Sequence, residues 1–330
     1  VDEAATTEIY TFSLVVALRI SSFSASSISC TMASSHAAGT YPVKMLVSNL
    51  GYALDADEPL TYDYSLTVSA ISPTSGSRGG RQTLTVTGTG FGTTAAMNTV
   101  KIGSIECDVQ TATNTEITCL TGKTSSEVTS KVAVTVSHPD ASSDHDAVSS
   151  ADSYEYKDSL TPVVTSVSPT RGSTAGGTSL TIGGTGLSSS LTVKIDGVEC
   201  TQSAQQAADT TATIMYCTTG AHATMFEPAI IHVHDSTNGD AYNEDTTYQF
   251  IDLWSRWTTW GGTPPPVFGD SAVISEGQVV MVDYSPPRFH LIIVMGQLIF
   301  DDTTDIFFEC TYIMVNFGRL TIGTAEKPYK

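Results

Sequence analysis

The sequence contains few positively charged residues. Lys and Arg number 15 against 34 Asp and Glu, so the formal net charge is −19. A protein binds a nucleic-acid backbone through clustered Lys and Arg that displace counterions, and this sequence has no such cluster. The shortage argues against nucleic acid as a partner and against an anionic membrane surface. An acidic chain instead suits calcium, a basic protein surface or simple colloidal solubility.

Long apolar runs are also missing, as are long stretches with helical periodicity and clear caps. The most apolar early stretch, residues 10–20, is shorter than the roughly 18 residues of a membrane span, and Arg19 interrupts it. Because Thr and Val favour strands, a chain rich in Ser, Thr and Gly predicts an all-β fold. Its 330 residues should form roughly two to four domains. Since it starts at Val1 without a basic and apolar leader, we expect a processed chain or a piece of a longer one.

Several chemical motifs are absent. The sequence has no Cys-x-x-Cys pair and no Asn-x-Ser/Thr sequon. The Gly-rich stretch "TGTG" at 87–90 is not followed by a helix or by a P-loop lysine, so it does not predict phosphate binding. We therefore expect no cofactor, with calcium left open by the acidic composition. N-linked glycan is not expected, whereas Ser/Thr-rich loops leave O-glycosylation open.

What the sequence does contain is a repeat. "SPTSGSRGGRQTLTVTGTGFG" at 72–92 returns as "SPTRGSTAGGTSLTIGGTGLS" at 168–188. An offset of 96 positions pairs Pro73 with Pro169 and Leu84 with Leu180. This length is too long for a solenoid unit and suits one small β-sandwich domain.

Each repeat predicts strands. "TLTVTG" at 83–88 and "SLTIGG" at 179–184 alternate apolar and polar residues with the period of a strand. Asp196-Gly197, between two apolar stretches, predicts a two-residue hairpin. We expect Pro73 and Pro169 to fix φ at the entry to the first strand of each repeat.

The six cysteines follow the repeat. Cys107 and Cys119 lie in one copy, and Cys200 and Cys217 lie at matching places in the next. One pair per domain is typical of intradomain disulfides in an oxidising, extracellular compartment, and we favour it over free thiols or zinc. Each bridge should stabilise its domain by roughly 3 kcal/mol. The pairing of Cys30 and Cys310 stays open.

Aromatic residues close each repeat and indicate a third one. Tyr62, Tyr154 and Tyr248 are spaced by 92 and 94 residues. The stretch "SISC" ending at Cys30 matches "EITC" ending at Cys119, and "TYPVKMLVSN" at 40–49 matches the later penultimate strands. We therefore expect residues 1–68 to be the C-terminal part of a third sandwich.

The repeated pattern S-P-x-x-G-x-x-x-G, then L-T-[VI]-x-G-x-G-[FL], then two strands that each carry a cysteine, resembles the IPT/TIG domain. The resemblance covers 69–158 and 159–252, and 1–68 in part. It implies tandem immunoglobulin-like β-sandwiches, as in plexins and other cell-surface receptors. Without the disulfide, the domain also occurs in some transcription factors.

From Leu253 the pattern changes. Trp254, Trp257 and Trp260 fall within seven residues. The motifs W-S-x-x-x-T-W, P-x-x-x-G-D-x-x-V-I, G-x-L-x-F-D-D and G-x-L-x-I-G-T-x-x-x-P follow one another and resemble the G8 domain. The family domain is longer, so 253–330 would be its truncated N-terminal part. The resemblance implies the start of a right-handed parallel β-helix-like domain.

Three groups of side chains are candidates for chemistry. His232 and His234 lie two apart on a predicted strand and, with Asp235 or His222, have the composition of a metal site. We favour a solvent-facing pair, because they align with the outward face of the preceding repeat. The acidic group Asp301, Asp302 and Asp305 has the composition of paired glycosidase carboxylates. A solvated turn or a loose calcium contact is the favoured interpretation.

The tryptophans are the third group. Trp254, Trp257 and Trp260 are residues of the kind that stack on sugar rings. We favour a hydrophobic cap that closes the G8 domain and fixes its junction with the preceding sandwich. We thus predict no catalytic, cofactor or metal residue in this chain.

The combination of tandem IPT/TIG and G8 resembles the fibrocystin-like family of cell-surface proteins, several of which are ciliary or flagellar. This implies a non-enzymatic structural, adhesion or receptor ectodomain fragment of a larger membrane-anchored or secreted protein. Its partners would be cell-surface proteins, an extracellular filament, further copies of itself or carbohydrate. The alternative is part of a G8-containing cell-surface enzyme that degrades hyaluronan-type polysaccharide. A DNA-binding IPT/TIG protein is opposed by the charge and by the paired cysteines.

Overall fold

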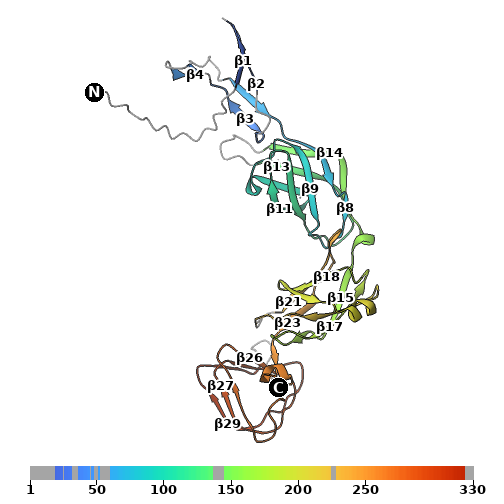
Figure 1. The fold of residues 1–330 in the computed structure, drawn as a ribbon, viewed down its shortest axis with the longest axis vertical. Helices are drawn as coiled ribbons and strands as arrows, with labels where there is room; N and C mark the ends of the chain where they lie inside the picture. Colours follow the sequence, from blue (N-terminus) through green and yellow to red (C-terminus); the bar gives the residue numbers. More distant parts are fainter. Residues whose placement is uncertain are drawn as a thin grey trace, which may run out of the picture. The chain divides into compact units, whose positions relative to one another are not determined.

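The computed structural model describes residues 19–24, 26–31, 36–44, 46–47, 51–52, 60–136, 145–223 and 228–323. The described elements are drawn along the chain in Figure 1, and the chain divides into two compact units. The first unit is Val1–Gly76 with Gly80–Lys157, and the second is Ser77–Gly79 with Asp158–Lys330. Strands dominate both. Within the described ranges, no helix is long and apolar enough to cross a membrane.

The first unit contains a sandwich made from one eight-stranded sheet in the order β7-β9-β12-β11-β10-β13-β14-β8. Its two end strands, β7 and β8, are separated by only two residues in the chain, so the sheet must curl back on itself around a core. We call it the first sandwich. Its elements are β7 (Thr67–Ser72), β8 (Ser75–Gly76), β9 (Thr83–Thr89), η1 (Ala95–Met97), β10 (Asn98–Ile102), β11 (Ile105–Ala112), β12 (Glu116–Thr121), β13 (Val128–Val136) and β14 (His145–Tyr156).

The core of this sandwich follows the alternation of its strands. In β9, Leu84 and Val86 are fully buried, whereas Thr83 and Thr87 are exposed. Leu84 pairs across the ladder with Cys119 of β12, which is also fully buried. The period-two pattern predicted for 83–88 is therefore confirmed. Burial of the inward face from several strands supplies the hydrophobic free energy of the fold.

The second sandwich, in the second unit, repeats this order as β15-β17-β20-β19-β18-β21-β23-β16, with β22 paired to β21. The predicted hairpin is confirmed, because Ile195 pairs with Val198 around Asp196 and Gly197, both with positive φ. Its elements are η2 (Asp158–Leu160), β15 (Val163–Ser168), β16 (Arg171–Gly172), β17 (Ser179–Thr185), β18 (Thr192–Ile195), β19 (Val198–Thr201), α1 (Ala204–Asp209), β20 (Ile214–Thr219), β21 (Ala229–Asp235), β22 (Gly239–Asp240) and β23 (Thr247–Phe250).

The prediction that the prolines precede the first strand of each repeat is wrong. Pro73 follows β7 and Pro169 follows β15, each after a cis peptide bond with the preceding serine. A proline donates no ladder hydrogen bond. Each proline therefore lies in the two-residue connection between the two end strands of its curled sheet, β7 and β8 in the first sandwich and β15 and β16 in the second.

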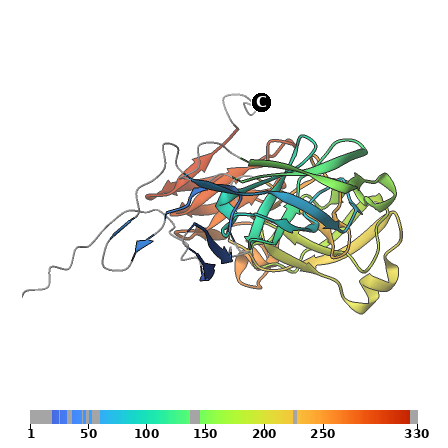
Figure 2. The same cartoon turned by 90° about the horizontal axis from the view of Figure 1, so that it is seen from above.

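The helix α1 lies between β19 and β20 and has no counterpart in the first sandwich. It is drawn in yellow at the outside of its sandwich in Figure 2. Its start is a capping box, in which the Ser203 hydroxyl accepts a hydrogen bond from the Gln206 N–H and the Gln206 side chain accepts one from the Ser203 N–H. This insertion lengthens the segment between the two cysteines.

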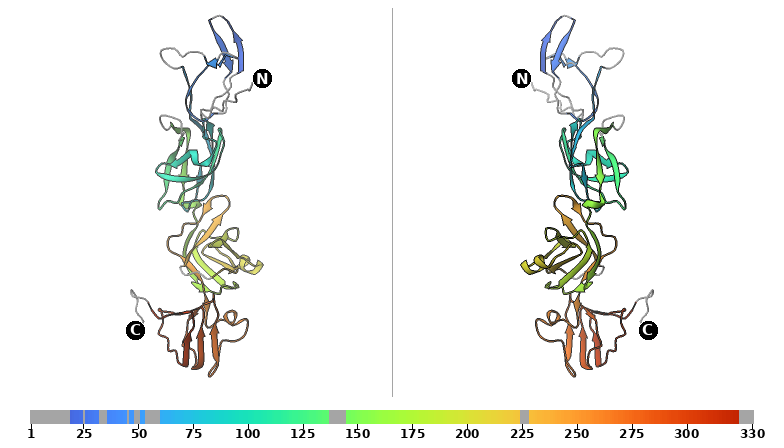
Figure 3. Two further views of the ribbon diagram at one scale, coloured as in Figure 1. Left: turned by 90° about the vertical axis from the view of Figure 1, so that its left-hand side faces the viewer. Right: turned by 90° about the vertical axis from the view of Figure 1, so that its right-hand side faces the viewer.

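The rest of the second unit is the parallel region, whose strands alternate along the chain between two parallel sheets. The orders are β24-β26-β28-β30 and β25-β27-β29. Arrows of the second of these sheets, orange to red, lie side by side in Figure 3. The elements are β24 (Asp252–Leu253), η3 (Trp257–Trp260), β25 (Ser271–Ile274), β26 (Val279–Val282), β27 (Phe289–Val294), β28 (Gln297–Phe300), β29 (Cys310–Val315) and β30 (Arg319–Thr321).

Side chains in the parallel region stack in register. Val280, Leu298 and Leu320 occupy paired positions of β26, β28 and β30, and the first two are fully buried. Gly296 allows this close stacking, because a Cβ there would lie 2.2 Å from two backbone oxygens. Short apolar strands punctuated by glycine therefore become successive layers of one stack.

The N-terminal part of the first unit has short paired strands. β1 (Arg19–Phe23) pairs with β2 (Ile28–Thr31), β3 (Gly39–Pro42) with β6 (Thr61–Tyr64), and β4 (Leu46–Val47) with β5 (Gly51–Tyr52). Strands thus form at Cys30 and at Tyr62, where the sequence predicts them. Other parts of the predicted third repeat, including residues 1–18 and 53–59, lie outside the described residues.

Candidate functional site

Two buried disulfides occupy the same place in the two sandwiches. Cys107 is joined to Cys119 across β11 and β12, with their Cα atoms 5.5 Å apart. Cys200 is joined to Cys217 across β19 and β20, with their Cα atoms 5.4 Å apart. These are the pairs that the sequence predicts. Cys30 and Cys310 carry free thiols, and burial raises the pKa of Cys310.

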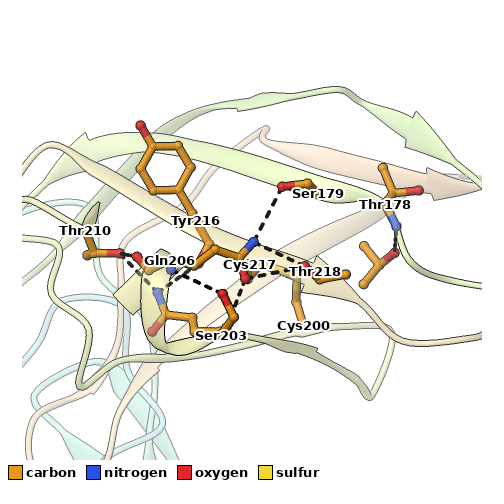
Figure 4. The surroundings of a disulfide bond; sticks show 11 residues. Thr178, Ser179, Cys200, Ser203, Gln206, Thr210, Tyr216, Cys217 and Thr218 are labelled. Atoms are coloured by element: carbon orange, nitrogen blue, oxygen red, sulfur yellow. Dashed lines mark hydrogen bonds between the residues drawn. A yellow bond between two sulfur atoms is a disulfide. The ribbon is translucent and has the colours of Figure 1, made fainter. Parts of the chain in front are cut away.

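Helix α1 is fixed to the strand that carries the second disulfide (Figure 4). The Gln206 side-chain amide donates to the Thr218 hydroxyl at 3.1 Å, and Gln202 donates to the Tyr216 carbonyl at 2.8 Å. The two cysteines here are 17 residues apart, against 12 in the first sandwich. The longer loop is thus ordered by its own polar contacts, and the bridge geometry is kept.

The predicted histidine pair faces outward and shares one carboxylate. His234 Nδ1 lies 2.7 Å from Asp240 Oδ1, and His232 Nδ1 lies 3.6 Å from Asp240 Oδ2. Asp240 is buried, whereas the side chains of His232 and His234 are 55% and 41% exposed. The other two residues considered with them do not join this pair. Asp235 accepts hydrogen bonds from Thr237 and Asn238, and His222 pairs with Asp196.

These contacts give the histidines a structural partner. Asp240 is a buried carboxylate, and the two histidines supply polar contacts of the kind that its charge requires. Across the ranges that the structure covers, no group of three or more His, Cys, Asp or Glu is arranged to hold a metal ion. A polar contact at the end of β21 therefore explains the pair.

The acidic group at 301–305 is held by local contacts. Asp301 Oδ1 accepts hydrogen bonds from the N–H and hydroxyl of Thr303, and its Oδ2 lies 3.2 Å from Arg171 Nη1. Burial favours the neutral form of Asp301, but the Thr303 hydrogen bonds and the Arg171 charge outweigh it and lower the pKa. Asp305 is exposed. A catalytic acid needs a raised pKa, so Asp301 has the opposite electrostatics.

The three tryptophans divide into two roles. Trp254 is fully buried in the core of the parallel region, and its ring lies 4.8 Å from that of Trp260 in an edge-to-face contact. Trp260 Nε1 donates to the Trp254 carbonyl at 2.8 Å. Trp257 is 63% exposed. The rings of Trp254 and Trp260 therefore pack in the core, while the ring of Trp257 is available to solvent.

The sequence did not reveal the contacts at the start of the parallel region. Asp252 Oδ1 accepts from the Thr174 N–H at 3.2 Å and from the Thr174 hydroxyl at 2.7 Å. One signal was present: an acidic residue follows the closing aromatics in both "YEYKD" and "YQFID", as Asp158 and Asp252. The residues that meet them, Arg78 and Thr174, stand at matching positions of the repeat and could have been paired with them.

Comparison with protein families matches both parts of this architecture. The IPT/TIG domain model matches residues 66–156 and 162–250, and the G8 domain model matches residues 259–330. The two IPT/TIG matches correspond to the two sandwiches, and the G8 match lies in the parallel region.

Curated relatives carry the same similarity along the chain. Fibrocystin-L from Mus musculus is 32% identical over 314 residues, which is 92% of this chain and 7% of that protein. Fibrocystin-L from Homo sapiens is 32% identical over 304 residues, 89% of this chain and 7% of that protein. This chain therefore spans only a small fraction of the length of these relatives.

Among solved structures, the full extracellular region of plexin A4, domains 1 to 10, is 20% identical with a TM-score of 0.30, covering 64% of this chain and 17% of that one. The family assignment rests on the domain matches, which cover more than half of the sequence. With two IPT/TIG domains followed by a G8 domain and its extended similarity to Fibrocystin-L, this chain belongs to the IPT/TIG domain family and is fibrocystin-like.

Proposed function

We propose that this chain is a non-enzymatic part of an extracellular ectodomain, in which IPT/TIG sandwiches act as disulfide-braced structural modules. One observation carries the proposal: two consecutive domains keep the same buried disulfide between the same two strands. A bridge conserved between repeats is a feature of proteins that fold in an oxidising compartment.

The proposed organisation has four parts. Residues 1–68 would be the C-terminal part of an IPT/TIG sandwich, 69–158 and 159–252 two IPT/TIG domains, and 253–330 the N-terminal part of a G8 domain folded as a β-helix. We place this array on a cell surface, including that of a cilium or flagellum, as in the fibrocystin-like family. Its partners would be other surface proteins, an extracellular filament, further copies of itself or carbohydrate. The acidic charge suits a basic protein surface, and the exposed Trp257 suits carbohydrate.

Surface labelling of cells that express the protein tests the location. An antibody against the second sandwich should stain intact, unpermeabilised cells, and ciliary staining should coincide with a ciliary membrane marker. Staining that needs permeabilisation would overturn the proposal. Non-reducing mass spectrometry of the same protein should show peptides of Cys107 joined to Cys119 and of Cys200 joined to Cys217.

A second candidate function is part of a cell-surface enzyme that degrades hyaluronan-type polysaccharide. It is favoured by the G8 match and by the exposed Trp257, since an exposed indole suits a sugar face. The test is incubation of the protein with high-molecular-mass hyaluronan, followed by gel analysis of chain length. We expect no shortening, with a hyaluronidase as positive control. Shortened chains would establish the enzyme instead.

A further inference from the structure

We propose that the second sandwich and the parallel region fold and open as one cooperative body, joined by a junction in which the last strand of the sandwich becomes the first strand of the parallel sheets. The residues of this junction, 251–258, lie between the segments that the two family models match. The inference concerns the second unit alone and does not depend on where the protein is located.

The backbone is continuous across the junction. β23 ends at Phe250 and β24 begins at Asp252, so only Ile251 lies between them. The Ile251 N–H donates to the Gly172 carbonyl in the sandwich at 2.9 Å. Two residues later, Leu253 pairs with Met281 in the parallel ladder of β24 and β26. A linker with free rotation would leave its backbone groups to water, whereas here the Ile251 N–H donates to the sandwich and the Trp254 N–H donates to the Met281 carbonyl of the parallel region at 2.8 Å.

The side chains at the junction form a small core of their own. Ile251 and Leu253 pack with Val279 and Met281, all buried, and Ile299 packs against them. This core is separate from that of the sandwich and from the main core of the parallel region. Ile251, the residue directly after the last strand of the sandwich, packs here on side chains of the parallel strands, so separating the two parts would expose this apolar surface, which is unfavourable.

Polar contacts close the junction around this core. Arg171, in the short strand β16 of the sandwich, reaches the parallel region, where its Nη1 lies 3.2 Å from Asp301 Oδ2 and 3.3 Å from Met281 Sδ. Thr174, three residues on, donates twice to Asp252. The Asp301 side chain is 13% exposed, so its charge would be left poorly solvated if Arg171 withdrew.

The preceding repeat uses the same positions. Arg78 stands where Thr174 stands, and Asp158 where Asp252 stands; Arg78 Nε pairs with the Asp158 carboxylate. The Lys157 N–H donates to the Gly76 carbonyl at 3.0 Å, as the Ile251 N–H does to Gly172. Both repeats therefore contain a contact between the position of Arg78 or Thr174 and the acidic residue that follows the closing aromatics. In the second repeat this acidic residue, Asp252, is also the first residue of the parallel sheets.

Hydrogen exchange on the full chain tests whether the two parts open together. Replacing Arg171 with Met and Thr174 with Val alters only the sandwich side. If the body is cooperative, amide exchange in β26 and β28 of the parallel region should accelerate by roughly tenfold. The matched control is Arg288→Met, which removes an ion pair with Glu309 that lies within the parallel region, with both side chains about half exposed. It should leave exchange in β26 and in the sandwich strands unchanged.

Unchanged exchange in β26 and β28 of the Arg171→Met/Thr174→Val variant would overturn the proposal. A second variant keeps the test decisive if that one fails to fold. Inserting four Gly-Ser residues after Ile251 preserves every side chain but separates the two halves of the junction. Loss of protection in both β23 and β26 supports one body, whereas native protection on both sides of the insertion means two independent domains.

Discussion

At the scale of single residues, the disulfides are the positions whose removal has the clearest expected effect. Cys200→Ala with Cys217→Ala removes a bridge across a 17-residue separation. The unfolded chain then regains conformational freedom, so the free energy of unfolding should fall by about 3 kcal/mol. Urea denaturation of the double variant against the wild type measures this. Cys30→Ala, at an exposed thiol, is the control, and an equal loss there would contradict the assignment.

The inward face of β17 permits a second comparison. Leu180 is fully buried, while the next residue, Thr181, faces the other side of the strand and is half-buried. Leu180→Ala should lower the free energy of unfolding by about 2–5 kcal/mol, because it removes apolar contacts and leaves a cavity. Thr181→Ala should cost well under half as much. Thermal unfolding of the two variants under the same conditions checks the ranking, and equal losses would place β17 in a different register.

Residue patterns predicted buried positions well and polar contacts poorly. Period two at Leu84 and Leu180 identifies core residues because burial depends on local alternation alone. The sequence pattern groups Asp301 with its neighbours Asp302 and Asp305, but its charge partner, Arg171, is 130 residues away in the sequence. An ion pair of this separation is set by how two elements meet, and no local pattern encodes it.

At the scale of elements, α1 is a helix that the sequence pattern did not predict. Helical periodicity becomes visible only over a long stretch of sequence, and a helix of six residues is too short to display it. Its capping box, Ser203 followed three residues later by Gln206, was nonetheless readable. The expectation that long helices are absent therefore says nothing about a helix this short, and the insertion was missed.

The cap supplies a prediction for this element. Ser203→Ala removes the hydroxyl that accepts from the Gln206 N–H at 3.2 Å. The helix should lose about 1 kcal/mol, and amide exchange at Gln206 should accelerate by roughly fivefold. NMR-detected exchange measures it, with Ser189→Ala in an exposed loop as control. Unchanged protection at Gln206 would mean that the Gln206 contacts with Thr218 hold the helix without the cap.

At the scale of the whole molecule, the repeat was the most informative feature of the sequence. It predicted two sandwiches, their disulfide pairs and the strand alternation, since these depend on contacts that each copy makes within itself. It did not predict the position of Pro73 after the first strand, because β7 precedes the motif that defines the repeat. Nor did it predict the junction at Ile251, because this residue lies between the segments that match the IPT/TIG and G8 families and belongs to neither pattern.

The electrostatics of the second unit give a pH dependence. The folded state lowers the pKa of Asp301 below its unfolded value, so it stabilises the fold above the unfolded pKa. This contribution is lost as the pH falls through the folded pKa, because the carboxyl must then be protonated in both states. Asp301→Asn should therefore cost about 2 kcal/mol at pH 7 and progressively less below about pH 4.

Urea denaturation of the wild type and of Asp301→Asn between pH 7 and pH 2 measures this convergence. Asp305→Asn, at an exposed carboxylate in the same segment, is the matched control and should give a small difference at every pH. A deficit of Asp301→Asn that stayed constant down to pH 2 would mean that the side chain acts through packing rather than charge. Convergence would instead assign the loss to the charge of Asp301, which the hydrogen bonds from Thr303 and the ion pair with Arg171 of the sandwich stabilise together.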